Sequence, residues 1–369
     1  MKRVKQSDIV VGKPIPFDCY DQANNLLLKR GTVLASQGQL AILIERGLYS
    51  DDLISTARKA EAPKEAPSVF TQLTMIEMHL EKLFQGVIAK QPDPDFPTTI
   101  LQLARDIQTL CALDADAVLG ALHLNQKRRY TVVHPIDVAV LCELIGLRKE
   151  MPREARLPML AAALTANISI LDLQERMHTQ VEPLSAGQRD TLHIHPILSV
   201  DLLLELGVKN EDWFAAVLHH HEKLDGSGYP GAKRGEDIPL SARIVGLADT
   251  YSAMVTTRRY RQAILAKDAL REVFMQRGAE IDAELAGLFI KEMGIYPPGA
   301  FVKIANGDTA IVLKRGKNGT SPIVKCIIGP RGAPLPFPLV RDTSQSGFEI
   351  REMVQRDPTL KLTPRQVWS

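Results

Sequence analysis

One long stretch of helical periodicity limits the folds that this chain can adopt. From Thr71 to about Met293, apolar residues recur at helical spacing, and the stretch is interrupted at 91–97 by the sequence QPDPDFP. Such spacing gives each helix one apolar face, and these faces are buried most readily against one another. The sequence therefore predicts a mainly α-helical domain as the body of the protein.

The regions on either side of this stretch have strand character. Residues 1–56 combine short β-like runs with one expected helix at 37–46, and an Ala-, Lys-, Glu- and Pro-rich linker follows. Near the C-terminal end, three β-rich runs alternate with Asn-Gly pairs, which are the strongest short hairpin signal. The expected organisation is a small α+β N-terminal module (1–56), a linker (57–70), a helical segment (71–124), an all-helical domain (125–295) and a small antiparallel β appendage (296–369).

The two amphipathic helices expected within 71–124 have two possible uses. They can pack into the core of the helical body, which is the commoner use of such helices. They can also contact a second copy of the chain in a homodimer. The sequence leaves both uses open.

Charge, cysteine content and hydropathy exclude several classes of protein. The formal net charge is +2, so the overall charge does not favour DNA or an anionic membrane as a partner. The four cysteines are scattered without CxxC spacing, which argues against a disulfide framework and a zinc knuckle. We find no signal peptide after the basic N-terminus and no window that approaches the roughly 20 apolar residues of a membrane span. We therefore expect a cytoplasmic protein without a DNA or membrane partner.

Histidines gather where an apolar helix meets a glycine loop. Eight of the nine histidines lie within 123–221, and three of them form His219-His220-His221, directly before the loop 225–230 (DGSGYP). Helical spacing from Val217 directs His220 and His221 toward the core side. Two adjacent buried imidazoles repel each other when protonated, so a shared cation is one explanation for them. A helix end that attracts histidine through the helix dipole is the alternative.

Four further positions suit metal and phosphate chemistry. His134 and His195 each stand before a proline at the expected start of an apolar helix. Asp249 lies on an otherwise apolar helix face, where a carboxylate is costly unless it binds a metal or pairs with an arginine such as Arg243 or Arg258. The RRYR run at 258–261 can bind phosphate through its guanidinium groups, although a solvated basic turn has the same composition.

Several motifs, in this order and spacing, closely resemble the HD-GYP family, a branch of the HD superfamily of metal-dependent phosphohydrolases. The motifs are His220-His221-Glu222, Asp225-Gly226-Ser227-Gly228-Tyr229-Pro230, Ile238-Pro239-Leu240, Ala248-Asp249 and Arg258-Arg259-Tyr260-Arg261. The resemblance covers roughly residues 125–295. It implies an all-helical domain with two or three metal ions, commonly iron or manganese, and hydrolysis of the bacterial second messenger cyclic di-GMP.

The resemblance also implies the residues of the site. It implies metal ligands at His134, His195, His220, His221 and Asp249. It implies ligand contacts from Gly228, Tyr229 and Pro230 of the loop and phosphate contacts from Arg258 and Arg261.

The chain departs from the family at the element that gives the family its name. The His-Asp dyad followed by Ile-Gly-Lys is replaced by Ala166-Asn167 followed by Ile168-Ser169-Ile170. In the family the dyad aspartate bridges two metals, whereas Asn167 is neutral and a poor bridging ligand. Two-metal hydrolysis needs that bridged pair. We therefore expect no catalytic residue at the dyad positions and at most one divalent ion, iron or manganese, on the remaining imidazoles.

Two functions are compatible with this combination. In the first, the protein is a bacterial cyclic di-GMP signalling protein that is impaired in catalysis and binds cyclic di-GMP, a related nucleotide or a partner such as a GGDEF-domain protein. In the second, it is an active metal-dependent cyclic di-GMP phosphodiesterase that uses a reduced metal site. The sequence contains no other catalytic signature such as a P-loop, GxSxG or a zinc-protease motif. Enzymatic activity therefore stays open between the two.

Overall fold

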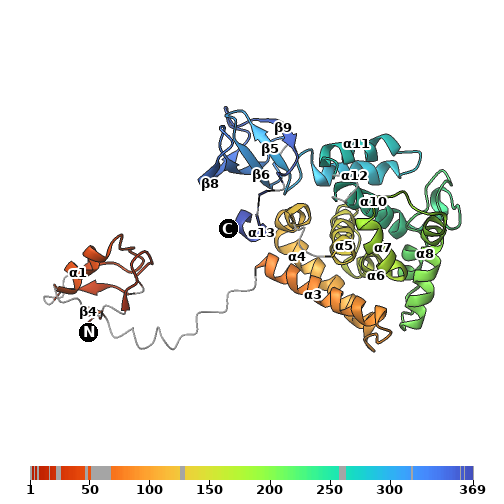
Figure 1. Ribbon diagram of the computed structural model, residues 1–369, viewed down its shortest axis with the longest axis horizontal. Coiled ribbons are helices and arrows are strands. Elements are labelled where there is room, and N and C mark those ends of the chain that lie inside the picture. Colours follow the sequence, from red (N-terminus) through yellow and green to blue (C-terminus); the bar gives the residue numbers. More distant parts are fainter. Residues whose placement is uncertain are drawn as a thin grey trace. The chain divides into compact units, whose positions relative to one another are not determined.

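A computed structural model describes residues 2–3, 5, 8–15, 17–21, 26–45, 49–50, 68–124, 129–256, 263–316, 319–357, 359–360 and 362–368 (Figure 1). The chain divides into two compact units, Met1–Pro67 and Ser68–Ser369. Of the linker expected at 57–70, residues 57–67 lie outside the described part, and the first helix of the second unit already begins at Val69.

The N-terminal unit is the small α+β module that the sequence predicts. Its antiparallel sheet has the order β1 (Lys2–Arg3), β4 (Tyr49–Ser50), β2 (Cys19–Tyr20) and β3 (Leu26–Leu28). One helix, α1 (Gln37–Glu45), supplies Leu40 to a core that also contains Ile15 and Phe17. The helix expected at 37–46 is thus confirmed.

The second unit begins with the helical body. Its helices, in chain order, are α3 (Val69–Ile88), α4 (Phe96–Leu124), α5 (Tyr130–Arg148), α6 (Arg153–Thr165), η2 (Ile168–Ile170), α7 (Leu171–Thr179), α8 (Ala186–Glu205), α9 (Glu211–His219), η3 (Gly235–Asp237), α10 (Leu240–Val255), α11 (Ala266–Gln276) and α12 (Ala283–Met293). Side-chain caps fix several starting points: Ser185 and Gln188 form a capping box for α8, and the Asn210 side chain accepts the backbone N–H of Trp213 at the start of α9. These two caps fix where α8 and α9 begin. Helix α8 contains His195, and His220 and His221 directly follow α9.

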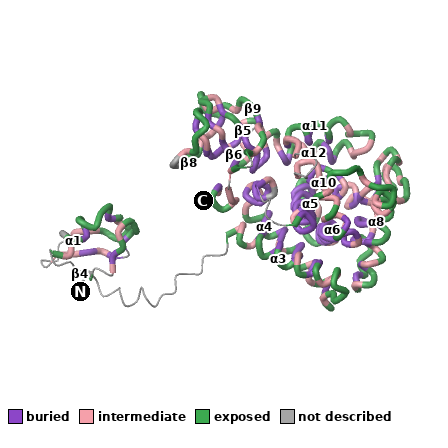
Figure 2. Tube along the Cα trace, in the orientation of Figure 1, coloured by how far each residue is buried: buried purple, intermediate pink, exposed green. Residues whose placement is uncertain are grey.

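Helices α5 and α6 form the centre of the body (Figure 2). Nearly every residue of α5 is buried, and helices α3, α4, α6, α9 and α10 pack into the same core cluster. Two segments, Tyr130–Arg148 (α5) and Arg153–Thr179 (α6 to α7), are long and apolar enough to cross a membrane. The expectation that no window approaches a membrane span is therefore wrong. However, 89% and 72% of these apolar windows are buried within the protein, which makes them core helices of this unit.

A buried ion pair joins α5 to α6. Arg156 donates from Nε and Nη2 to the two carboxylate oxygens of Glu143, both at 2.9 Å. The two side chains are only 8% and 2% exposed, and Gln108 of α4 adds a donor to the same carboxylate at 3.4 Å. The pair therefore replaces the hydration that both charges lose on folding.

The C-terminal appendage is a five-stranded antiparallel sheet with the order β8 (Pro334–Asp342), β7 (Ile323–Ile328), β6 (Thr309–Lys314), β5 (Phe301–Ile304) and β9 (Ile350–Val354). The sequence predicts β5, β6 and β7. It misses β8, which contains three alternating prolines (PLPFPLVRD) but tolerates them because it is an edge strand. The chain ends in α13 (Pro364–Trp368), whose Trp368 ring lies against Gly120 of α4.

A buried carboxyl group on α5 gives a prediction about pH. Asp137 is 6% exposed. Its pKa is well above the usual value, first because burial disfavours the charged form and second because Glu77 of α3 adds negative potential. The folded state thus keeps a proton that the unfolded chain releases near pH 4. The stability contributed by this proton is complete below that pH and is lost as the pH rises toward the folded-state pKa.

We expect Asp137→Asn to remove this pH slope. The variant should be more stable than the wild type at pH 7, on the order of 1–3 kcal/mol, and close to it at pH 4. Urea unfolding at both pH values is the measurement, with Asp201→Asn on the exposed face of α8 as the matched control. Equal changes in the two variants would contradict the prediction.

Candidate metal centre

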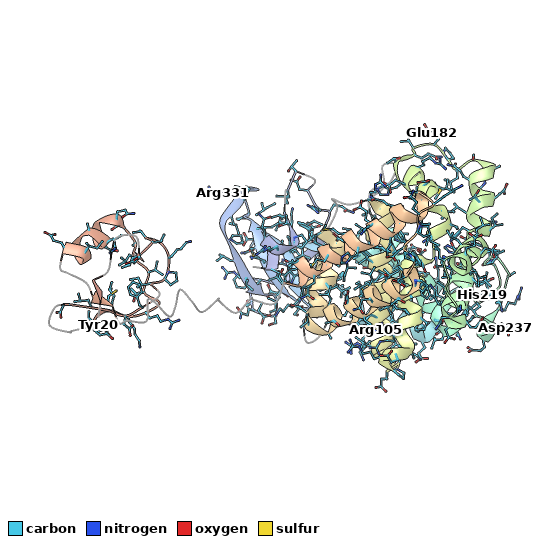
Figure 3. The ribbon with its side chains drawn as sticks, turned by 90° about the horizontal axis from the view of Figure 1, so that it is seen from below. Tyr20, Arg105, Glu182, His219, Asp237 and Arg331 are labelled. Carbon is cyan, nitrogen blue, oxygen red and sulfur yellow. The ribbon has the colours of Figure 1, made fainter. Side chains whose placement is uncertain are left out.

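Three histidines converge between α8 and the end of α9. His195 lies in the middle of α8 and not at a helix start as expected, because the Ser185 cap starts this helix at Ala186. His220 and His221 directly follow His219, which is the last residue of α9 and is labelled in Figure 3. One ligand nitrogen from each of the three rings lies within 4.8 Å of the other two. The ring centroids are 5.3 Å apart for His195 and His220, and 4.0 Å apart for His220 and His221. This spacing allows one cation to contact all three rings.

The hydrogen bonds of two of these rings fix which nitrogen is available. His195 Nδ1 donates to the carbonyl of Leu192, and His220 Nδ1 donates to the carbonyl of Val217, both at 2.6 Å. A carbonyl oxygen can only accept, so each Nδ1 carries the proton and each Nε2 carries a lone pair. Both Nε2 atoms are buried, and neither has a hydrogen-bond partner among the described residues. Fixing Nδ1 in this way is typical of metal-binding histidines.

The electrostatics of the three rings favour the neutral form that binds metals. The pKa of His195 is lowered to about 4, mainly by burial and secondly by the neighbouring His220. Burial also lowers the pKa of His220 and lowers that of His221 well below its usual value. Neutral imidazole suits iron and zinc among other ions. The three residues therefore fit a divalent metal ion.

The other two predicted ligands lie together and form a pair. His134 Nε2 and Asp249 Oδ1 are 2.8 Å apart, and His134 Nδ1 is 3.0 Å from the Ser252 hydroxyl. Burial opposes ionisation of Asp249, but its hydrogen bond to His134 keeps its pKa below the usual value. Burial lowers the pKa of His220 and His221, and the negative charge of Asp249 partly offsets this lowering, so the pair acts electrostatically on the three-histidine cluster.

Two details of this pair differ from the expectations. Of the arginines considered as partners of Asp249, Arg243 instead binds Glu236 and Asp282 at 3.0 and 2.9 Å. Arg258 lies outside the described residues, so its pairing with Asp249 stays a prediction. In addition, helix α5 begins at Tyr130 rather than at His134, because Tyr130 packs into the body and its ring stacks on that of His134 at 4.8 Å.

The dyad positions supply no ligand to the cluster. Ala166 is buried where α6 ends, and the neutral Asn167 follows it just before η2. The next segment is attached to α8 instead: Ser169 Oγ donates to the His195 carbonyl at 3.1 Å and lies 2.8 Å from the Ser199 hydroxyl. The segment that follows the dyad positions thus contacts the backbone of His195.

The glycine loop folds back onto the residues that precede it. The Tyr229 N–H donates to the His221 carbonyl at 3.1 Å. The Glu222 carboxylate accepts the N–H groups of Gly231 at 2.6 Å and Lys233 at 2.9 Å. Gly228 lies so close to the backbone of 221–223 that a Cβ atom would collide with it. The loop is therefore held by backbone contacts that require glycine at 228 and a carboxylate at 222.

The structure describes three of the five predicted ligand-binding residues. Gly228, Tyr229 and Pro230 lie in the loop beside the histidines, with the Tyr229 ring centroid 4.7 Å from that of His221. Arg258 and Arg261 lie outside the described residues, so their predicted role stays a prediction.

Sequence reasoning missed several residues that shape the centre. Gly246 of α10 lets the helix approach the His220 carbonyl, which a Cβ atom at 246 would overlap. A glycine in the middle of a helix was the available signal. Glu222 and Ser169 act through backbone contacts that no local pattern reveals.

Comparison with known proteins agrees with this geometry. A family described as HD domain matches residues 101–285. The chain is 28% identical over 260 residues to cyclic di-GMP phosphodiesterase PA4108 of Pseudomonas aeruginosa, which covers 69% of this chain and 60% of that protein. It is 24% identical over 309 residues to 3'3'-cGAMP-specific phosphodiesterase 3 of Vibrio cholerae, covering 73% of this chain and 67% of that protein.

A solved structure supports the fold. A protein titled as an HDG"Y"P protein from Bdellovibrio bacteriovorus has a TM-score of 0.53 and 13% identity, and the match covers 79% of this chain and 98% of that one. The chain thus spans only about 60% of the Pseudomonas relative, but nearly all of the solved structure.

Proposed function

Because the chain belongs to the HD domain family and is of the HD-GYP type, we propose that it binds one divalent metal ion and a cyclic dinucleotide without efficient hydrolysis. Its metal ligands in this proposal are His195, His220 and His221. It would act as a regulator in cyclic di-GMP signalling.

One observation carries the metal part of the proposal. His195 and His220 each present a buried Nε2 lone pair without a partner among the described residues, next to His221. A buried acceptor without a partner costs roughly 1–3 kcal/mol, and a metal ion bound by the cluster would remove this cost for both atoms. A metal ion bound there would supply positive charge for a phosphate oxygen.

The ligand class is supported by the relatives. Those with the longest matches are named for cyclic di-GMP or 3'3'-cGAMP, so a cyclic dinucleotide is the proposed ligand and cyclic di-GMP the first to test. Tyr229 of the glycine loop stands beside the histidines, with its ring centroid 4.7 Å from that of His221. A GGDEF-domain partner and a homodimer stay predictions.

The loss of efficient hydrolysis is proposed from the dyad positions. Ala166 and Asn167 offer no carboxylate, and Ile170 is a buried apolar residue where the family has lysine. The second ion of a two-metal mechanism would then lack its bridging ligand. The alternative, an active phosphodiesterase with a reduced site, is favoured by the His134–Asp249 pair, which is retained beside the three histidines.

Restoring the dyad tests this proposal. We expect the wild-type protein to bind about one metal ion and cyclic di-GMP with little turnover. The double variant Ala166→His/Asn167→Asp should bind additional metal and hydrolyse cyclic di-GMP at least about 100-fold faster, because removal of one charge-stabilising group alone typically costs that much. Elemental analysis, calorimetry and a turnover assay with Mn²⁺ or Fe²⁺ are the measurements.

The single variant Ala166→His is the control, since it adds an imidazole but no bridging carboxylate. If the wild type hydrolyses cyclic di-GMP only when metal is added, the proposal of impaired catalysis is wrong, and an active phosphodiesterase with a reduced metal site is favoured. Absence of any metal and any nucleotide binding in the wild type would overturn both.

A further inference from the structure

An exposed histidine outside all the recognised motifs lies against the glycine loop. His193 stands on α8, two residues before His195, and its side chain reaches the Tyr229 ring. The two ring centroids are 4.8 Å apart with an interplanar angle of 27°, which is a stacked arrangement. His193 is exposed to solvent, so burial does not account for its placement.

Three imidazoles contact the Tyr229 ring. His193 stacks on it at 4.8 Å, and His221 stacks on it at 4.7 Å with an angle of 28°. Tyr229 also meets His195 edge-on at 6.3 Å. The tyrosine ring therefore contacts two of the three histidines of the centre and joins α8 to the segment after α9.

Backbone hydrogen bonds join the glycine loop to the α9 side, and the Tyr229 ring contacts α8. The loop is attached through Tyr229 N–H to His221 and through Glu222 to Gly231 and Lys233, all on the α9 side. On the α8 side, the Tyr229 ring contacts His193 and His195, and of these two rings His193 is the stacked one. Movement of the Tyr229 ring away from the centre would separate the His193 stack.

We infer that His193 is a positioning residue that closes the three-histidine centre by holding Tyr229 over it. This inference rests on the proposed function, because it concerns access to the proposed metal ion. A stack of this kind changes the population of the closed loop by about three- to tenfold. In this inference the ion passes the Tyr229 ring on entry and on exit, so weakening the stack should speed both steps by a similar factor and leave the equilibrium affinity nearly unchanged.

Metal exchange kinetics test the inference. The protein is loaded with Co²⁺, and release is followed by visible absorption after addition of excess chelator; association is followed by stopped flow. We expect His193→Ala to raise both rate constants about three- to tenfold, and His193→Phe, which keeps an aromatic ring, to restore wild-type rates. Ile194→Ala, the neighbouring exposed residue on α8, is the matched control and should behave as the wild type.

The outcomes separate this inference from the proposed function. If the wild type binds no Co²⁺, the proposed function fails. If it binds Co²⁺ but His193→Ala exchanges at the wild-type rate, or His193→Phe exchanges as fast as His193→Ala, the positioning role is wrong. If His193→Ala instead weakens equilibrium binding strongly and phenylalanine does not rescue it, His193 is a ligand rather than a positioning residue.

Discussion

His220→Ala is expected to weaken metal binding by more than about 100-fold. Loss of an outer-shell partner of a ligand already costs about 10- to 100-fold in affinity, and His220 is proposed to bind the ion itself. Its Nε2 is buried and its ring lies 4.0 Å from His221 and 5.3 Å from His195. The two remaining imidazoles supply only two nitrogen ligands, and the nearby Asp249 carboxylate is hydrogen-bonded to His134.

Calorimetric titration with Mn²⁺ or Co²⁺ measures this effect, together with the metal content after dialysis. His79→Ala is the matched control, because His79 is an exposed histidine of α3. Far-UV circular dichroism of the metal-free proteins shows whether the helices persist in both variants. If the two variants bind metal equally well, the three histidines are not the metal centre.

The second large effect concerns stability. Glu143→Ala is expected to lower the free energy of unfolding by about 3–5 kcal/mol, because it leaves the guanidinium of Arg156 buried without a countercharge. Arg156 is 8% exposed at its side chain and holds both carboxylate oxygens of Glu143. The remaining partner of its guanidinium is the Met151 carbonyl, which cannot neutralise the charge.

The matched control is Glu284→Ala, which breaks the ion pair with Lys149 at a carboxylate that is 68% exposed. An exposed pair of this kind contributes less than about 1 kcal/mol. The double variant Glu143→Leu/Arg156→Met removes both charges and should recover most of the lost stability. Urea unfolding distinguishes the cases, and a loss in Glu143→Ala as small as in Glu284→Ala would show that the buried pair is not needed.

Much of the fold could be predicted because its signals are local. The spacing of Ile100, Leu103 and Ile107 describes one helix face without reference to the rest of the chain, and all three are buried in α4. Strands β5 and β6 follow from alternating apolar residues around Asn306-Gly307. Strand β8 could not be predicted, because its prolines are acceptable only at a sheet edge, and the edge is defined by the other strands.

The candidate site could be predicted only in part. The motif order predicts which residue types belong together, and the structure brings His195, His220 and His221 to within 4.8 Å. The family resemblance assigns His134 and Asp249 to the same ligand set, but it does not predict their direct hydrogen bond across 115 positions. A contact across that separation depends on how α5 packs against α10, and helix periodicity does not specify helix packing.

The sequence by itself determined the helical body, the family and the loss of the dyad, because these depend on residue identity and spacing. Only the tertiary structure decided that two Nε2 atoms of the cluster are buried without partners among the described residues, and that Tyr229 stacks on both His193 and His221. The physical reason is that a free lone pair or a ring stack depends on which groups surround a side chain. In this protein those surroundings are supplied by α8 and by the loop after α9, which only folding brings together.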